Sequence, residues 1–297
     1  LLTAAGHSIV SDPARAEELI VNTYGFIESA KQESIDAVLE MAQYKEKGVC
    51  KTLVVTGCLS QRYRRELTEA MPEVDIFLGV REYEKLPALL GGEPQPCGKI
   101  HRVLTTPPYS AYLRIGDGCD NRCAYCAIPL IRGPLRSTPM EDLLSEAETL
   151  VGGGVTELTL IAQDTSGYGV DLYGRPRLME LMDRLTGLDG LHWLRVLYTY
   201  PDTVAPALID QMAENPKIVN YLDLPLQHID EAVLRRMHRR GTPAHITKIM
   251  DHIQRNAPDF MLRTTMMVGF PGETEAAFRR MLDFLRAHPF DRVGAFA

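Results

Sequence analysis

Three cysteines cluster within one short stretch of the sequence. Cys119, Cys123 and Cys126 have the spacing C-x3-C-x2-C, and loop-forming residues lie among and before them: Gly116, Gly118, Asp120 and Asn121. A flexible loop allows three sulfur atoms to converge on one point without straining a helix or a strand. Thiolates are soft ligands that select zinc, Cu(I) or iron–sulfur clusters. The stretch therefore predicts a metal site.

The number of thiols leaves two kinds of metal site open. Closed zinc sites and iron–sulfur clusters take four protein ligands, and this stretch supplies three. A four-iron cluster held by three cysteines keeps one iron open to a small molecule, and we favour this interpretation. The alternative is a three-cysteine zinc knuckle completed by a distant histidine such as His228. A single histidine in such a place is more often only a polar loop residue.

Length and composition indicate a two-domain protein of the reducing cytoplasm. The chain has 297 residues, and domains average roughly 150 residues. The formal net charge of −7 means that the surface as a whole does not attract nucleic acid. No apolar run is long enough to span a membrane. Six cysteines, half of them clustered, do not form a disulfide scaffold.

Residues 1–90 alternate strand and helix patterns and predict an N-terminal domain with a parallel sheet. Strands are expected at 19–23, 53–57 and 74–79, and ligands of such sheets bind beyond the strand C-termini. Tyr24 and Cys58 fall at that edge. The first six residues resemble the middle of a helix, so we expect the true N-terminus to be missing. Residues 91–108 form a linker rich in glycine and proline, in which Cys97 is expected to be a spare thiol.

Residues 109–297 repeat a strand–helix unit six times. The expected strands are 112–115, 158–161, 193–197, 221–224, 262–268 and 292–296. The fold class is therefore α/β, with the N-terminal sheet followed by a partial (βα)6 barrel whose chemistry lies at the strand C-termini. Polar, glycine-containing loops follow the second, fourth and fifth strands and favour one ligand pocket on the same edge as Cys119. The chain stops on the sixth strand, so a C-terminal part is expected to be missing too.

The cysteine spacing resembles the cluster motif of radical S-adenosylmethionine (SAM) enzymes, which also prefer an aromatic residue at the position of Tyr125. Over nearly its whole length the chain resembles the radical SAM methylthiotransferase family, and it is most similar to the RimO type, which modifies an aspartate of a small-subunit ribosomal protein. The stretches that carry the resemblance are residues 21–27, 56–63, 119–133, 162–165, 222–228 and 268–274. Sister enzymes that act on tRNA adenosine usually carry Gln-Asn at Gln163-Asp164 and Gln-Ser at Gln227-His228. Both departures favour the ribosomal-protein branch.

The resemblance implies the cofactors and partners. One 4Fe-4S cluster is held by the three clustered cysteines, and its open iron binds SAM, which an electron splits to give a 5′-deoxyadenosyl radical. The expected SAM-binding residues are Tyr125, Glu157, Gln163, Gln227, Gly269 and Gly272; no catalytic residue is assigned beyond the cluster. For Glu157 a plain solvated carboxylate is an equal alternative. The implied partners are a reductant such as flavodoxin or ferredoxin and the ribosomal protein, free or on the ribosome; tRNA methylthiolation and a non-catalytic, RNA-docking zinc module remain alternatives.

The resemblance also implies an auxiliary 4Fe-4S cluster held by three N-terminal cysteines, and a C-terminal TRAM domain. Cys58 stands at one auxiliary position, and Tyr24 stands at another. The remaining cysteine would lie upstream of Leu1, and the TRAM domain is absent. A phenol is a hard oxygen ligand and a poor substitute for a thiolate. We therefore expect one cluster in this chain.

A basic run, Arg235–Arg240, lies at a predicted helix end. Such runs are usually solvated faces that the helix dipole favours. Contact with RNA or with a ribosomal surface is the alternative.

Overall fold

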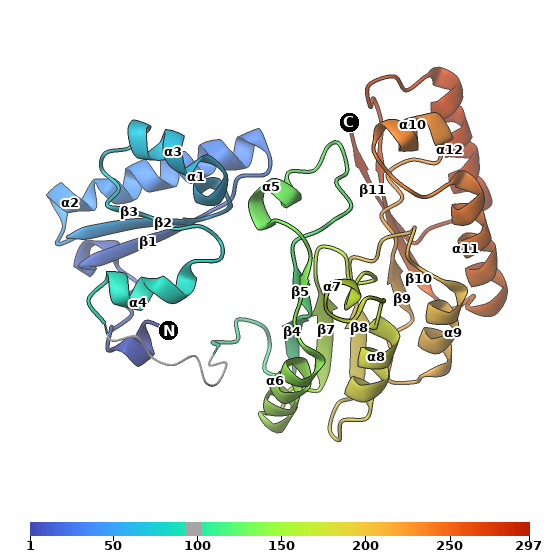
Figure 1. Cartoon of the computed structure of the whole chain (residues 1–297), viewed down its shortest axis with the longest axis horizontal. Helices are drawn as coiled ribbons and strands as arrows, with labels where there is room; N and C mark the ends of the chain where they lie inside the picture. Colours follow the sequence, from blue (N-terminus) through green and yellow to red (C-terminus); the bar gives the residue numbers. More distant parts are fainter. Residues whose placement is uncertain (93–101) are drawn as a thin grey trace. The chain divides into compact units, whose positions relative to one another are not determined.

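The computed structural model describes residues 1–92 and 102–297 and divides the chain into two compact units (Figure 1). The first unit contains Leu1–Arg102 and also Ala127–Gly133, and the second contains Val103–Cys126 and Pro134–Ala297. The sequence did not predict that the short segment after the cysteines belongs with the N-terminal unit. Cys97 lies outside the described residues.

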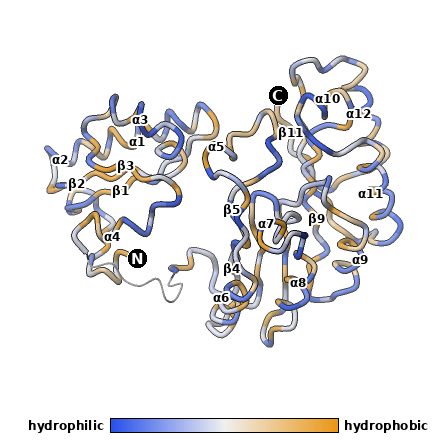
Figure 2. The backbone as a smooth tube through the Cα atoms, viewed as in Figure 1, coloured by the Kyte–Doolittle hydropathy of each residue, from blue (hydrophilic) through white to orange (hydrophobic). Residues whose placement is uncertain are grey.

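The first unit is a parallel three-stranded sheet with helices on both faces. The strand order is β1 (Glu18–Thr23), β2 (Thr52–Gly57), β3 (Ile76–Phe77). Leu53, Val54 and Val55 of β2 are buried on both faces, as a central strand of a covered sheet requires, and Figure 2 shows the hydrophobic colouring of these strands. The helices are α1 (Glu28–Ala42), α2 (Tyr44–Lys47), α3 (Cys58–Ala70), α4 (Leu86–Leu89) and α5 (Ile128–Arg132), with 3-10 turns at Thr3–Ala5, Pro13–Arg15 and Tyr83–Lys85.

The carboxyl ends of β1 and β2 approach each other so closely that only glycine fits at the crossing. Gly57 has a φ of 101°, and a Cβ atom placed on it would lie 2.2 Å from the carbonyl oxygen of Thr23. A Cβ atom on Gly25 would lie 2.8 Å from the Cα atom of Leu59. The chain after β1 therefore lies directly against the first turn of α3, which brings Tyr24 and Cys58 to the same edge.

The second unit contains six parallel strands in chain order, as expected for a partial (βα)6 barrel. One sheet has the order β4 (Ser110–Arg114), β7 (Glu157–Ile161), β8 (Trp193–Val196), and the other contains β9 (Tyr221–Asp223), β10 (Met261–Met267) and β11 (Arg292–Phe296). An isolated bridge between Leu194 of β8 and Ile218 connects β8 to the segment that leads into β9. A short antiparallel pair, β5 (Gly116–Asp117) and β6 (Arg136–Ser137), extends beyond β4.

The helices cover this sheet with one apolar face each. They are α6 (Met140–Gly152), α7 (Val170–Tyr173), α8 (Leu178–Thr186), α9 (Pro206–Glu214), α10 (Glu231–Arg236), α11 (Pro243–Asn256) and α12 (Glu275–Ala287). In α8, Leu178, Leu181, Met182 and Leu185 are buried at the spacing of one helical face. Their side chains join a single core with the strand residues, and this core fixes the edge from which the functional loops emerge.

Replacing Gly57 by alanine is expected to destabilise the first unit by about 3 kcal/mol, because the new Cβ atom overlaps a backbone carbonyl in a conformation that only glycine adopts readily. The midpoint of urea unfolding measures the change. Gly6→Ala is the matched control, since Gly6 also has a positive φ but has no atom within 4 Å of the new Cβ. It should cost only about 1 kcal/mol. Equal effects of the two variants would contradict the close approach at Gly57.

Candidate functional site

The three clustered cysteines lie on an irregular loop, residues 118–126, that begins directly after β5 at the carboxyl end of β4. We call it the cysteine loop. Gly118 and Arg122 have positive φ values of 79° and 50°, which turn the backbone between the cysteines. Cys123 is buried, whereas Cys119 and Cys126 are partly exposed. Burial raises the pKa of the Cys119 thiol, so a bound cation is needed to favour its thiolate.

The cysteine loop fits an iron–sulfur cluster better than a single metal ion. In residues 1–92 and 102–297, no three His, Cys, Asp or Glu side chains converge closely enough to hold one ion. Zinc needs four ligands at about 2.0–2.3 Å from one point. In a four-iron cluster each thiolate binds a different iron, so the sulfur atoms stand further apart. Three soft thiols on one loop are the donor set that such a cluster requires.

His228 does not complete a zinc site. Its side chain is fully buried, and Nε2 lies 3.2 Å from Oε1 of Glu273. Nδ1 accepts a hydrogen bond of 2.9 Å from the backbone N–H of Asp230. Both ring nitrogens are therefore engaged, and the zinc alternative, which used His228 as the fourth ligand, is wrong. The imidazole instead links the loops after β9 and β10, because Glu273 also accepts the N–H of Gly269.

One side of the cysteine loop is anchored by a buried carboxylate that the sequence did not identify as part of the site. Asp164 follows β7, and its Oδ2 accepts a 2.8 Å hydrogen bond from the amide of Asn121. Its Oδ1 accepts 2.6 Å and 3.1 Å hydrogen bonds from the hydroxyl of Ser166 and the N–H of Gly167. Ser166 in turn accepts the N–H of Tyr200, after β8. This network fixes the cysteine loop to two neighbouring strand ends.

The other side of the cysteine loop is anchored by the basic run. The N–H of Ala124 donates to the carbonyl of Met237 at 3.0 Å. The guanidinium of Arg239 donates to the hydroxyl of Tyr125 at 3.5 Å. Arg239 is only 8% exposed, so the expectation that the whole run forms a solvated or RNA-contacting face is wrong for this residue. Its side chain lies inside the barrel edge because α10 ends at Arg236 and the chain turns inward.

Four of the predicted SAM-binding residues follow the carboxyl ends of strands. Gln163 follows β7, and its Oε1 atom is buried without a hydrogen-bond partner in the described part of the chain. Gln227 follows β9 with a φ of 67°, and its backbone bonds to Thr265 and Met267 of β10. Gly269 and Gly272 follow β10; the N–H of Gly269 and the carbonyl of Gly272 are bound to Glu273 and Arg236. Only Gln163 therefore presents a buried polar atom in need of a ligand.

Glu157 does not lie near the cysteine loop. It is the first residue of β7 and pairs in register with Ser110 and Trp193, the first residues of β4 and β8. The carboxyl end of β7 is roughly 13 Å away, at 3.3 Å per residue. Its carboxylate binds the guanidinium of Arg195 at 2.9 Å. The prediction that Glu157 binds SAM is therefore wrong, because parallel register places it at the opposite edge of the sheet.

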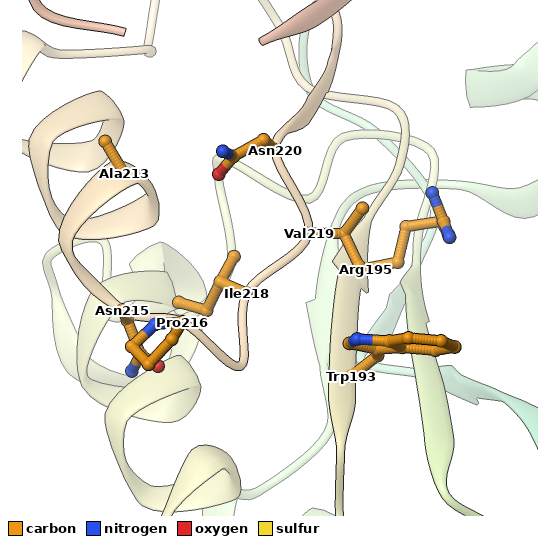
Figure 3. A pocket seen from close by; sticks show the side chains of 8 residues that line it. All are labelled: Trp193, Arg195, Ala213, Asn215, Pro216, Ile218, Val219 and Asn220. Carbon is orange, nitrogen blue, oxygen red and sulfur yellow. The ribbon is translucent and has the colours of Figure 1, made fainter. Parts of the chain in front are cut away.

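A hollow of about 420 Å³ lies at that opposite edge. Figure 3 shows that its lining side chains come from the first half of β8, the end of α9 and the segment before β9. The lining residues are Trp193, Arg195, Ala213, Asn215, Pro216, Ile218, Val219 and Asn220. Because these residues precede the strand centres, the hollow is separate from the carboxyl-end chemistry.

The N-terminal unit does not provide a second set of three thiols. Cys58 begins α3 and packs with Val80 and Ile131. Cys50 lies before β2, so the six-residue strand separates the two thiols by roughly 20 Å. Burial raises the pKa of the Cys50 thiol, which keeps it neutral. Tyr24 is 52% exposed, and Ser34 binds both its backbone N–H and its carbonyl. These residues do not fit a three-cysteine cluster.

Family comparisons identify both units. The model of the radical SAM superfamily matches residues 113–285, and that of the uncharacterized protein family UPF0004 matches residues 1–79. The ribosomal protein uS12 methylthiotransferase RimO of Acetivibrio thermocellus is 46% identical, over the whole of this chain and 70% of that protein. The chain belongs to the RimO family of radical SAM methylthiotransferases. RimO of Alkaliphilus oremlandii is 48% identical over 98% of this chain and 68% of its own length.

Membership of the RimO family confirms several predictions. The chain is a radical SAM enzyme of the transferase class, and the cofactors of its family are a 4Fe-4S cluster and SAM. The alternative of a non-catalytic zinc module is wrong, and the ribosomal-protein branch is favoured over the tRNA branch.

Solved structures confirm the α/β radical SAM fold. The methyltransferase TsrM of Kitasatospora setae, solved with cobalamin and a [4Fe-4S] cluster, superposes with a TM-score of 0.68 at 14% identity, covering 94% of this chain and 63% of that one. The cobalamin-dependent enzyme OxsB gives a TM-score of 0.64 at 13% identity, covering 90% of this chain and 43% of OxsB. No described helix is long and apolar enough to cross a membrane.

Asn121→Ala is expected to release iron from a reconstituted RimO-type cluster about tenfold faster than the unmodified chain. The change removes the 2.8 Å bond to Asp164, and a hydrogen bond to a charged group contributes about 1.5 kcal/mol. Iron capture by a chelator measures the rate. Asp120→Ala is the control, because Asp120 is exposed and accepts only a 3.4 Å contact from Leu135. An unchanged rate in Asn121→Ala would show that this anchor does not hold the loop.

Proposed function

We propose that Cys119, Cys123 and Cys126 bind one 4Fe-4S cluster, that SAM binds at its open iron, and that the substrate is an aspartate of ribosomal protein uS12. The observation that carries this proposal is the anchored cysteine loop at the carboxyl edge of the barrel, in a chain about 46% identical to RimO proteins. The bound cluster supplies the electron that cleaves SAM and so provides a radical able to remove hydrogen from carbon.

The protein residues have separate tasks at this site. The three thiolates hold the cluster, and the bond between Asn121 and Asp164 fixes the loop. The unsatisfied Oε1 atom of Gln163 is suited to accept a hydrogen bond from the ammonium or a hydroxyl group of SAM. The tight backbone turn at Gln227 holds the loop after β9 against β10. These residues bind and orient; none of them is required to exchange a proton.

We further propose that the chain acts in the cytoplasm with a low-potential reductant such as flavodoxin or ferredoxin. The RimO relatives are named for uS12, whose modified aspartate carries the methylthio group on its β-carbon in this family. The described residues are equipped for the radical half of that reaction. Tyr24 and the separation of Cys50 from Cys58 leave the sulfur-donating half without a three-cysteine site.

The reconstituted chain, given SAM, a reductant and uS12 with β-deuterated aspartate, is expected to produce 5′-deoxyadenosine that contains deuterium. The label reports removal of hydrogen from the β-carbon and does not require completion of methylthio transfer. Mass spectrometry of the nucleoside measures it. Cys123→Ala should form no 5′-deoxyadenosine, because loss of one of three thiolates exposes the cluster to loss.

Cys50→Ala is the matched control, since its thiol has a printed bond only to the carbonyl of Thr52 and lies outside the site. It should retain deuterium transfer. Deuterium that arises from labelled tRNA and not from uS12 would assign the chain to the tRNA branch. Retained SAM cleavage by Cys123→Ala would overturn the proposed cluster ligands.

The chain is expected to bind roughly four irons after anaerobic reconstitution, corresponding to one four-iron cluster. Tyr24 supplies a phenol where the family has a thiol, and Cys50 and Cys58 lie at opposite ends of β2. Tyr24→Cys alone should leave the iron content near four, because it gives two thiols at that edge instead of three. Iron and sulfide assays measure the content. About eight irons in the unmodified chain would contradict the one-cluster interpretation.

A further inference from the structure

A buried positive charge lies beside the cysteine loop without an ion-pair partner. The guanidinium of Arg239 donates to the carbonyl of Pro225 at 2.7 Å and to the hydroxyl of Tyr125 at 3.5 Å, and it lies 4.1 Å from the ring centre of Tyr200. All three groups are neutral. No carboxylate of the described residues pairs with it; nearby Asp202 accepts the backbone N–H of Arg240 instead.

An isolated buried cation is costly, because the protein interior solvates charge poorly. Neutral carbonyl, hydroxyl and ring contacts compensate part of this cost. A guanidinium cannot lose its proton under ordinary conditions, so the cost cannot be avoided by neutralisation. The position therefore points to a negative group that is present when the site is loaded.

Both tyrosines connect Arg239 to cysteines of the loop. The hydroxyl of Tyr200 lies 3.6 Å from Sγ of Cys123, and the ring of the same tyrosine faces the guanidinium. Tyr125 directly precedes Cys126 in the chain. The carbonyl of Met237, two residues before Arg239, binds the N–H of Ala124. The charge is thus held behind two of the three proposed cluster ligands.

We propose that Arg239 is the counter-charge of the iron–sulfur cluster, positioned by Tyr200 and Tyr125 to raise the reduction potential of the cluster. The proposal rests on the proposed function, in which Cys123 and Cys126 are cluster ligands. Reduction adds one negative charge to the cluster, and a fixed positive charge in a poorly solvating site stabilises the reduced form. Arg239 is a positioning residue, since it touches the cysteine loop through tyrosines and not the reacting atoms.

The test is a redox titration of the full chain, reconstituted with iron and sulfide in the absence of SAM and followed by the electron paramagnetic resonance of the reduced cluster. In Arg239→Gln we expect at least a tenfold lower ratio of reduced to oxidised cluster at a fixed potential, which is a downward shift of about 59 mV for a one-electron couple. Arg239→Lys keeps the charge and should recover most of the shift. Arg240→Gln removes an exposed charge from the next residue and should leave the potential unchanged.

Each outcome decides the inference. An unchanged potential in Arg239→Gln, or an equal shift in Arg240→Gln, overturns it. If Arg239→Gln takes up too little iron to titrate, the iron content of Arg239→Lys decides: retention supports the charge, and loss in both variants leaves Arg239 a purely structural residue. Failure of the unmodified chain to form any cluster would instead overturn the proposed function.

Discussion

The structure of the site depends on how an irregular loop is held in place. The cysteine loop has no helix or strand of its own between β5 and α5, so side-chain and backbone bonds to other strand ends must fix its thiols. Asp164 holds it through Asn121, and the segment after α10 holds it through Ala124 and Tyr125. Since these anchors follow β7, β8 and β9, formation of the barrel and positioning of the thiols are one event.

The two positions that separate the ribosomal-protein branch from the tRNA branch both serve this positioning. Asp164 accepts hydrogen bonds from three groups on two oxygens, whereas an asparagine would offer one oxygen and introduce a donor toward Asn121. His228 bridges two loops through Glu273, a span that a serine is too short to make. Branch identity is therefore expressed in the supports of the site rather than in its cluster ligands.

The N-terminal unit presents the opposite case, in which the scaffold is retained while a ligand is replaced. Gly25 and Gly57 still allow the close approach of β1 and α3 that places residue 24 beside Cys58. Tyr24 occupies that place with half of its side chain exposed. Fold and ligand set are separable here, because backbone packing requires the glycines and cluster binding requires the thiols.

The sequence by itself determined the chemistry of the donors and the order of the elements. Spacing and softness of three thiols predict an iron–sulfur loop, and alternating patterns predict six strand–helix units, because both depend on neighbouring residues. Register and burial were decided only by the tertiary structure. Glu157 reads as a candidate ligand until pairing with Ser110 and Trp193 places it at the wrong edge. Arg239 reads as a surface charge until the turn after α10 buries it against Tyr200, because long-range packing decides which charges leave the solvent.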